Sequence, residues 1–330
     1  MEEEKTLYPL KFMPLFKDKI WGGNKVRDLI GIDYSPLERL GELWVLSAVE
    51  GQETVVENGF LAECTLKEVL EMYADELVGE DNFDKFGEDF PLLIKIIDAA
   101  DNLSVQVHPD DEYAWANDMQ NGKTEMWYVL QADEGAKIYC GFNQKETKAD
   151  IINRTRNNTI ESVLHVDEAK QGDLYYIPAG TVHAIGKGVL LAEIQQSSDA
   201  TFRIYDWNRK NEKGEARELH LEQGLKVMDL SAQEGTAKCH YHYHLNETTN
   251  MVESPYFVTN LIPLTNGLRK NLENSDTFYL YFCVAGGGFI NCMKERIPLK
   301  AGEIIMIPAI AKDVLIEPTP MMEILEITTL

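Results

Sequence analysis

The chain has 330 residues, 31 of them basic and 55 acidic, so its formal net charge is −24. This charge argues against a nucleic-acid-binding protein, which needs a basic face, and against a surface attracted to anionic lipid. The apolar content of 44% is that of an ordinary globular protein, and the length allows two packed domains. If the ligand is an anion, its pocket must carry a local positive charge against that of the whole chain.

The short apolar runs of residues 1–60 are separated by turns and predict strands and loops. Thr65-Leu-Lys-Glu68 has the spacing of a capping box and predicts a helix that runs to about Leu77. Residues 81–90 are interpreted as a loop. The apolar stretch from Pro91 to Ala99 predicts a buried strand.

Apolar and polar residues alternate from position 103, so Ser104, Gln106 and His108 share one face of a predicted strand. Pro109 ends this strand, and residues 110–117 predict a short helix. The later predictions are strands at 125–130, 174–177, 189–195 and 201–205, and helices over 146–168, with a break near 157, and over 215–229. Many short strands with turn signals predict a sandwich or barrel.

A weak internal repeat connects the two parts of the chain. Gly172-Asp-Leu-Tyr-Tyr-Ile-Pro178-Ala reappears as Gly302-Glu-Ile-Ile-Met-Ile-Pro308-Ala. The first copy carries His183 five residues after its proline, and the second has Asp313 at that place. The repeat therefore predicts two similar folds, the second of which has lost a ligand position.

This repeat divides the chain into a metal-binding domain with helical segments, residues 1–238, and a β domain without the metal site, residues 239–330. In the second domain, short β segments are expected from His240 onward. Gly286-Gly-Gly288 predicts a hairpin turn rather than a phosphate loop, because no helix follows it. His240-Tyr-His-Tyr-His244 is interpreted as an exposed β face near the domain junction, with adventitious metal binding as the alternative.

Four side chains, distant along the chain, predict one metal centre. Gln106 and His108 leave the same face of one strand ~7 Å apart. His183 follows a Pro-x-Gly turn that aims its ring inward, and Glu125 begins a later strand, on which Lys123 shares its side. Two imidazoles, a carboxylate and an amide oxygen suit Zn²⁺, although Mn²⁺, Fe²⁺ and Co²⁺ are not excluded. With a single carboxylate, the metal keeps net positive charge and remains a strong Lewis acid.

The pattern Gly-x₅-Pro-x-Gly-x₂-His over residues 172–183 matches the second conserved motif of the cupin barrel. The first motif is usually His-x-His followed closely by Glu, whereas this chain has Gln-x-His and a distant Glu125. That departure points to one family among the cupins. Four segments of the chain resemble type I mannose-6-phosphate isomerase in its short bacterial form. The segments are Leu103-Ser-Val-Gln-Val-His-Pro-Asp-Asp-Glu-Tyr-Ala114, Gly122-Lys-Thr-Glu-Met-Trp-Tyr128, Ile177-Pro-Ala-Gly-Thr-Val-His-Ala184 and Glu193-Ile-Gln-Gln-Ser-Ser-Asp-Ala-Thr-Phe-Arg-Ile-Tyr-Asp206.

The resemblance covers most of residues 10–230 and is weak beyond 240. It implies two cupin (jelly-roll) barrels with a few additional helices, and an enzyme that interconverts mannose 6-phosphate and fructose 6-phosphate through an enediolate. It also implies one Zn²⁺ per chain, an essential arginine that matches Arg203, an active-site lysine that matches Lys123, and four zinc ligands that match Gln106, His108, Glu125 and His183.

Three residues are candidates for substrate binding or catalysis. Lys123 could transfer a proton, because a lysine beside a metal has a lowered pKa, or it could bind phosphate. Arg203 could orient phosphate or stabilise the enediolate; its structural alternative is an ion pair with Asp199 or Asp206. Ser104 is a further candidate for substrate binding.

The general base stays unassigned, with Glu193 and Asp199 as candidates. Three other functions remain open: a non-catalytic sugar-phosphate-binding cupin, an isomerase of another hexose phosphate such as glucose 6-phosphate, and a cupin dioxygenase, against which Gln106 argues. The five cysteines are odd in number and scattered, which favours a reducing compartment. With no signal peptide and no apolar run long enough to span a bilayer, we expect a cytoplasmic protein of undetermined oligomeric state.

Overall fold

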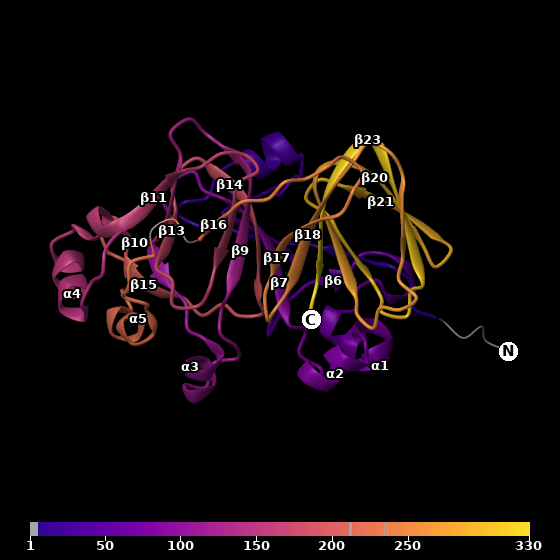
Figure 1. Cartoon of the computed structure of the whole chain (residues 1–330), viewed down its shortest axis with the longest axis horizontal. Helices are drawn as coiled ribbons and strands as arrows, with labels where there is room; N and C mark the ends of the chain where they lie inside the picture. Colours follow the sequence, from indigo (N-terminus) through magenta and orange to yellow (C-terminus); the bar gives the residue numbers. More distant parts are fainter. Residues whose placement is uncertain (1–5, 211–212, 234, 236) are drawn as a thin grey trace.

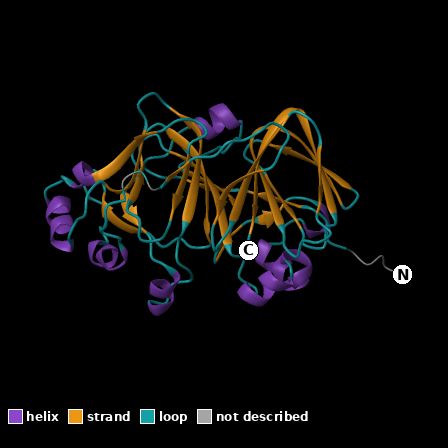
Figure 2. Cartoon of the chain, in the orientation of Figure 1, coloured by secondary structure: helices purple, strands orange, loops and turns teal. Residues whose placement is uncertain are grey.

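The structure is a computed structural model that describes residues 6–210, 213–233, 235 and 237–330. Two β barrels lie side by side, one in the purple and magenta part of the chain and one in the orange and yellow part (Figure 1). The helices lie on the outside of the barrels, some at their ends and some against a wall (Figure 2). The mainly β class predicted from the sequence is confirmed. No helix in the described ranges is long and apolar enough to cross a bilayer.

The first barrel consists of two sheets that face each other. One is seven-stranded, and its strands in spatial order are β16 (Lys238–Cys239), β12 (Leu174–Ile177), β9 (Glu125–Ala132), β14 (Val189–Gln196), β7 (Leu92–Asp98), β3 (Glu42–Leu46) and β2 (Leu15–Lys17). The other is five-stranded, with β11 (Leu164–Glu168), β10 (Lys137–Phe142), β13 (His183–Ile185), β8 (Val105–Val107) and β15 (Phe202–Tyr205).

The second barrel is built from one nine-stranded sheet. Its main path runs through β17 (Thr249–Glu253), β18 (Val258–Leu264), β23 (Asp313–Thr328), β20 (Tyr279–Cys292), β22 (Ile304–Ile307), β1 (Leu10–Met13) and β6 (Val55–Val56). Two further strands flank this path, β19 (Leu268–Asn271) on β23 and β21 (Glu295–Lys300) on β20. A separate hairpin is formed by β4 (Ala48–Val49) and β5 (Gln52–Glu53).

The sheet pairing crosses the domain boundary that the sequence analysis places after residue 238. Strand β1 pairs with β22, where Leu10 lies opposite Met306, and with β6 on its other side. The carbonyl of Leu77 accepts a hydrogen bond from the Ala309 amide. The second barrel therefore contains strands from the first 60 residues, and the division of the chain into two domains stays a prediction.

Alternation along the strands of the seven-stranded sheet separates two cores. On β9, Met126 and Tyr128 belong to a cluster shared with the second barrel, whereas Trp127 and Val129 belong to the interior of the first barrel. Tyr128 also donates a hydrogen bond of 2.8 Å to the Glu323 carboxylate of β23. Because both faces are buried, these strands are mostly apolar, which is why 91–99 is easily recognised as a strand.

The helices are α1 (Leu66–Val78), α2 (Glu80–Phe86), α3 (Asp111–Ala116), α4 (Lys148–Arg156) and α5 (Leu221–Val227), with short helical turns η1 (Val26–Ile30), η2 (Gly59–Leu61) and η3 (Ile160–Val163). The capping box of α1 is present: Thr65 accepts from the Glu68 amide, and the Glu68 carboxylate accepts from the Thr65 amide. The helix predicted over 110–117 is also confirmed, as α3.

The loop predicted over 81–90 is wrong, because α2 occupies its first part. The amides of Glu80 and Asp81 donate to the carboxylate of Asp276, at 3.1 and 3.2 Å. A residue almost 200 positions away thus caps a short, polar helix that has no strong local signal.

Two predicted helices are too long. Residues 164–168 form strand β11, paired with β10, rather than the end of a helix that began at 146. The helix predicted over 215–229 begins only at Leu221, since the chain before it is held against β15: the His220 amide donates to the Arg203 carbonyl at 2.7 Å. In both places tertiary pairing overrides a local helical pattern.

The hairpin turn predicted at Gly286–Gly288 is also wrong. These glycines lie inside the long strand β20, where the register with β23 shifts between Gly286 and Gly288. Gly286 has φ of +69°, a conformation that favours glycine. The bulge bends the strand against β23.

Both copies of the internal repeat have the same local structure, a glycine with positive φ followed by a strand. Gly172 and Gly302 each have φ of +83°, and β12 and β22 follow them. The three histidines of residues 240–244 are exposed, as expected near the junction of the barrels, but the segment is irregular and not the predicted β face, and Tyr241 is half-buried.

Candidate metal centre and active-site cavity

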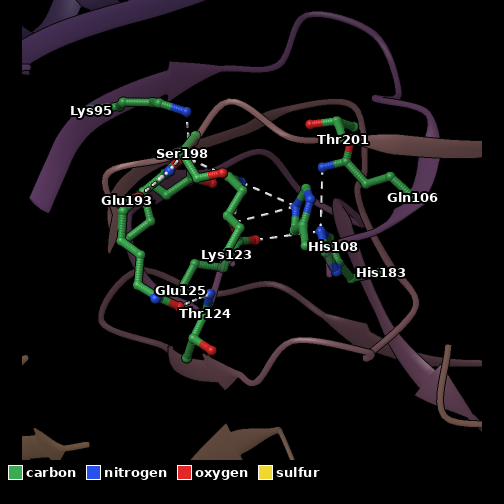
Figure 3. A network of polar contacts seen from close by, with 12 residues as sticks. Lys95, Gln106, His108, Lys123, Thr124, Glu125, His183, Glu193, Ser198 and Thr201 are labelled. Carbon is green, nitrogen blue, oxygen red and sulfur yellow. Dashed lines mark hydrogen bonds and ion pairs between the residues drawn. The ribbon is translucent and has the colours of Figure 1, made fainter. Parts of the chain in front are cut away.

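Both sheets of the first barrel contribute to one buried polar cluster (Figure 3). Gln106 lies on β8 and is paired across the ladder with His183 at the start of β13. His108 follows β8 directly, and Glu125 begins β9 in the opposite sheet. Nitrogen and oxygen atoms of His108, Glu125 and His183 lie within 4.8 Å of one another, and all three residues are buried.

The four predicted ligand residues are therefore brought together. The Glu125 carboxylate lies 3.5 Å from Nε2 of His108 and 3.4 Å from Nε2 of His183. The Gln106 amide lies 3.2 Å from Nε2 of His183. Turning that amide by half a rotation exchanges its nitrogen and oxygen, so that the oxygen faces the cluster.

Backbone carbonyls orient both imidazoles. Nδ1 of His108 lies 2.8 Å from the Ala200 carbonyl, and Nδ1 of His183 lies 2.8 Å from the Thr181 carbonyl. A carbonyl can only accept, so Nδ1 carries the proton and the lone pair of Nε2 faces the cluster. Burial, together with the Lys123 ammonium, lowers the pKa of His183 to about 4 and that of His108 well below its usual value, which keeps both rings neutral.

These residues fit a divalent cation. The Glu125 Oε1 atom is buried and accepts no hydrogen bond from any described residue. An unpaired carboxylate oxygen that faces two imidazole lone pairs is costly unless a cation satisfies it. The donors, which are nitrogen and oxygen atoms, suit Zn²⁺ and also other first-row divalent metals.

Lys123 adds a buried positive charge beside the cluster. Its ammonium contacts the Glu125 carboxylate, lies 3.1 Å from Nε2 of His108, and is 3.9 Å from the carboxylate of Glu193. Burial lowers the pKa of Lys123, but Glu125 and Glu193 outweigh burial and raise it above its usual value. The two carboxylates thus raise the pKa of Lys123, whereas the sequence predicts a lowered pKa.

Lys95 is a further charged residue of the cavity beside this cluster, and no sequence motif identified it. It lies opposite Glu193 in the ladder between β7 and β14, and the two side chains form a buried ion pair of 3.1 Å. Trp127 donates a hydrogen bond of 2.9 Å to the same carboxylate. Although burial raises the pKa of Glu193, Lys123 and Lys95 lower it to about 2. The available signal was a lysine within the apolar run of residues 92–97.

A cavity of about 310 Å³ opens beside the cluster, with Ser104, Gln106 and Lys123 in its wall. Its basic residues outnumber its acidic ones: the former are Lys17, Lys19, Lys95, Lys123, Arg203 and Arg217, and the latter are Glu42, Glu193 and Asp199. A chain with a net charge of −24 therefore has a locally positive cavity, as the sequence analysis required for an anionic ligand.

Arg203 lies on β15 directly opposite Gln106 in the ladder, so it is close to the His108–Glu125–His183 cluster. Its guanidinium donates to the Glu218 carbonyl at 2.7 Å. The structural alternative is wrong for the part of the chain that the structure describes, because Arg203 forms no ion pair there; Asp206 instead binds Arg209 and Arg217.

Comparison with known proteins places this geometry in a family. The family model for the catalytic domain of type I phosphomannose isomerase matches residues 9–145, and that for the cupin domain of mannose-6-phosphate isomerase matches residues 247–324. The cupin-type fold expected from the sequence is thereby confirmed.

Curated relatives match almost the whole chain. The chain is 37% identical to mannose-6-phosphate isomerase of Streptococcus mutans, over 91% of this chain and 92% of the relative. It is 36% identical to mannose-6-phosphate isomerase ManA of Bacillus subtilis, over 92% and 94%. The crystal structure of mannose 6-phosphate isomerase from Bacillus subtilis superposes with a TM-score of 0.86 at 31% identity and covers 98% of this chain and 99% of that chain. The chain belongs to the type I phosphomannose isomerase family.

Proposed function

We propose that the chain is a metal-dependent aldose–ketose isomerase that interconverts mannose 6-phosphate and fructose 6-phosphate. The observation that carries this proposal is the buried His108–Glu125–His183 cluster beside a cationic cavity, in a chain whose relatives bear the name of this activity. The reaction moves one proton between the two carbons C1 and C2 and another between their oxygens, so negative charge develops at the oxygens during the transfer.

The proposed metal ligands are Gln106, His108, Glu125 and His183, with one Zn²⁺ per chain as the first candidate ion. A bound divalent cation would supply Lewis-acid stabilisation of the negative charge that develops on the substrate oxygens. The buried and otherwise unpaired Glu125 Oε1 supports this assignment.

The proposed catalytic residues of the chain are Lys123 and Arg203. Lys123 Nζ, between the carboxylates of Glu125 and Glu193, would donate to a substrate oxygen and exchange a proton with it. Arg203, across the ladder from Gln106, would hold its positive charge against the same end of the substrate. Ser104, in the cavity wall, would donate a hydrogen bond to a sugar hydroxyl.

Glu193 is better suited to positioning than to acting as the general base. Its carboxylate already accepts from Lys95 and Trp127 and faces Lys123. A carboxylate that is paired with two cations is a poor proton acceptor. We therefore infer that Glu193 holds both lysines toward the cavity, whereas the general base stays unassigned.

Three further proposals concern the roles of the two barrels, the cellular compartment and the partner. We infer that the first barrel carries the reaction and that the second barrel, residues 239–330 with β1 and β6, supports it. The five cysteines are free in the structure, which supports a reducing compartment such as the cytoplasm. A small-molecule hexose phosphate is the proposed partner.

The test is an assay of mannose 6-phosphate turnover on protein stripped by a chelator and restored metal by metal. Activity is expected to disappear on chelation and to return with Zn²⁺ or another divalent ion. His183→Ala should lose both bound metal and activity, whereas His242→Ala, at an exposed position outside the cluster, should keep both. Persistence of metal and activity in His183→Ala would reject the site. Turnover of glucose 6-phosphate in place of mannose 6-phosphate would reject the substrate.

A further inference from the structure

Two of the six cations that line the cavity are not used in ion pairs. Lys19, Lys95, Lys123 and Arg217 each contact a carboxylate within 4 Å. Lys17 and Arg203 form no ion pair with any described residue, although both line the cavity. Arg203 lies on β15 of the five-stranded sheet, opposite Gln106, whereas Lys17 lies on β2, an edge strand of the seven-stranded sheet. Each of the two sheets that line the cavity therefore contributes one cation that has no carboxylate partner among the described residues.

Lys17 is held in place by neutral groups. Its ammonium donates to the side-chain oxygen of Gln52 at 2.6 Å and lies 4.5 Å from the centre of the Trp44 ring. Lys95 approaches the same ring to 5.2 Å. Lys19, two residues after Lys17, lies 3.1 Å from Glu42. Burial chiefly, and Lys19 and Lys95 to a smaller extent, lower the pKa of Lys17, whereas Glu42 partly opposes them.

The distance along the sheet matches the length of the proposed substrate. Glu125 lies on β9, and Trp44 lies on β3, three strands away in the order β9–β14–β7–β3. Neighbouring strands are ~4.8 Å apart, and the row through Trp44 reaches β9 at Trp127, two residues (~7 Å) from Glu125, so the separation is about 16 Å. An open-chain hexose 6-phosphate is roughly 9 Å from C1 to phosphorus, and a contact of about 3 Å at each end extends it to roughly 15 Å.

We propose that Lys17, with Lys19 beside it, binds the phosphoryl group of the substrate against Trp44, while Arg203 serves the reacting end at the metal. A phosphate dianion needs donors with positive charge, and a lysine without a carboxylate partner offers both at no cost of breaking an ion pair. This assignment rests on the proposed function, and it makes Lys17 a residue that selects phosphorylated over free sugars.

The experiment measures steady-state kinetics of the metal-loaded full chain with mannose 6-phosphate. Two competitive inhibitors probe the two ends of the cavity: inorganic phosphate for the Lys17 end, and sorbitol, an uncharged six-carbon polyol, for the metal end. The variants are Lys17→Met, Lys17→Arg and the double variant Lys17→Met/Lys19→Met. Lys145→Met, an exposed lysine outside the cavity, is the matched control.

In Lys17→Met, the KM for mannose 6-phosphate and the Ki for phosphate are expected to rise about tenfold, and further in the double variant. The Ki for sorbitol should change less than twofold in both, which shows that the variants are folded and loaded with metal. Lys17→Arg should recover most of the phosphate affinity.

A Ki for phosphate that is unchanged in the double variant would overturn the subsite. So would a rise found in Arg217→Met instead, because it would place the phosphate at the opposite wall. Failure of the unmodified chain to convert mannose 6-phosphate is a separate result, which rejects the proposed function, since phosphate binding to Lys17 can still be measured by calorimetry.

Discussion

Removal of Glu193 tests the electrostatics on which the cavity depends. Glu193 is buried between Lys95 at 3.1 Å and Lys123 at 3.9 Å, and its pKa is lowered from 4.5 to about 2. A shift of that size corresponds to about 3 kcal/mol of stability at neutral pH. We therefore expect Glu193→Gln to lower the free energy of unfolding by about 3 kcal/mol.

Lys95→Met is expected to cost less, about 2 kcal/mol, although it removes the other half of the same pair. The reason is that Glu193 keeps two partners, Lys123 and the Trp127 indole. The double variant Glu193→Gln/Lys95→Met should cost clearly less than the two single changes together, with a coupling of about 1–2 kcal/mol.

The assay is urea unfolding of metal-free protein, followed by tryptophan fluorescence, so that metal affinity does not contribute. Because the pKa of Glu193 is lowered in the folded state, its contribution is complete above about pH 5 and is lost as the pH falls toward 2. The difference between the parent chain and Glu193→Gln should therefore shrink with acidification.

The exposed pair Arg269–Asp313 is the control, and removing it should change stability by less than about 1 kcal/mol. Additive effects of Glu193→Gln and Lys95→Met, or a larger loss in Lys95→Met than in Glu193→Gln, would refute the shared-carboxylate arrangement.

Three further predictions concern the stability of the fold outside the cavity. Burial raises the pKa of Asp98 from 3.8 to about 6, so the parent chain should lose stability relative to Asp98→Asn as the pH rises through this range, as measured by urea midpoints. Asp276→Ala should destabilise by about 1 kcal/mol and increase amide exchange in α2, because both capping acceptors are lost; unchanged exchange would contradict the capping role. Gly286→Ala should lower the thermal midpoint, since the added Cβ would lie 2.2 Å from the Met321 carbonyl oxygen, and a neutral effect would show that β20 can shift.

Features that depend on short stretches of sequence were predictable. The capping box at Thr65 and Glu68 fixes the start of α1, and alternation places Gln106 of β8 on the same side of the chain as His108, which follows the strand. The turn before His183 aims its ring inward. Each signal operates within a few residues, and the structure brings the predicted ligands together as these signals indicate.

Features created by contacts between distant segments were not predictable. Helix α2 is capped by Asp276 from the second barrel, and residues 164–168 are a strand because β10 is available to pair with them. The same applies to Lys17 and Lys95. Their place in the cavity depends on the order of strands in the seven-stranded sheet, which no local pattern encodes.

The two faces of that sheet show how packing against the second barrel holds the charged residues of the first. On β7, Ile94 and Ile96 face the core shared with the second barrel, whereas Lys95 between them faces the cavity. Glu193 on β14 likewise lies between Ala192 and Ile194, which belong to the shared core. Apolar packing on one face therefore fixes the strands that hold the charges on the other, because successive side chains of a strand point to opposite sides. Because the face that packs against the second barrel is rigid, the buried lysines and glutamates on the cavity face keep their spacing without a bound substrate.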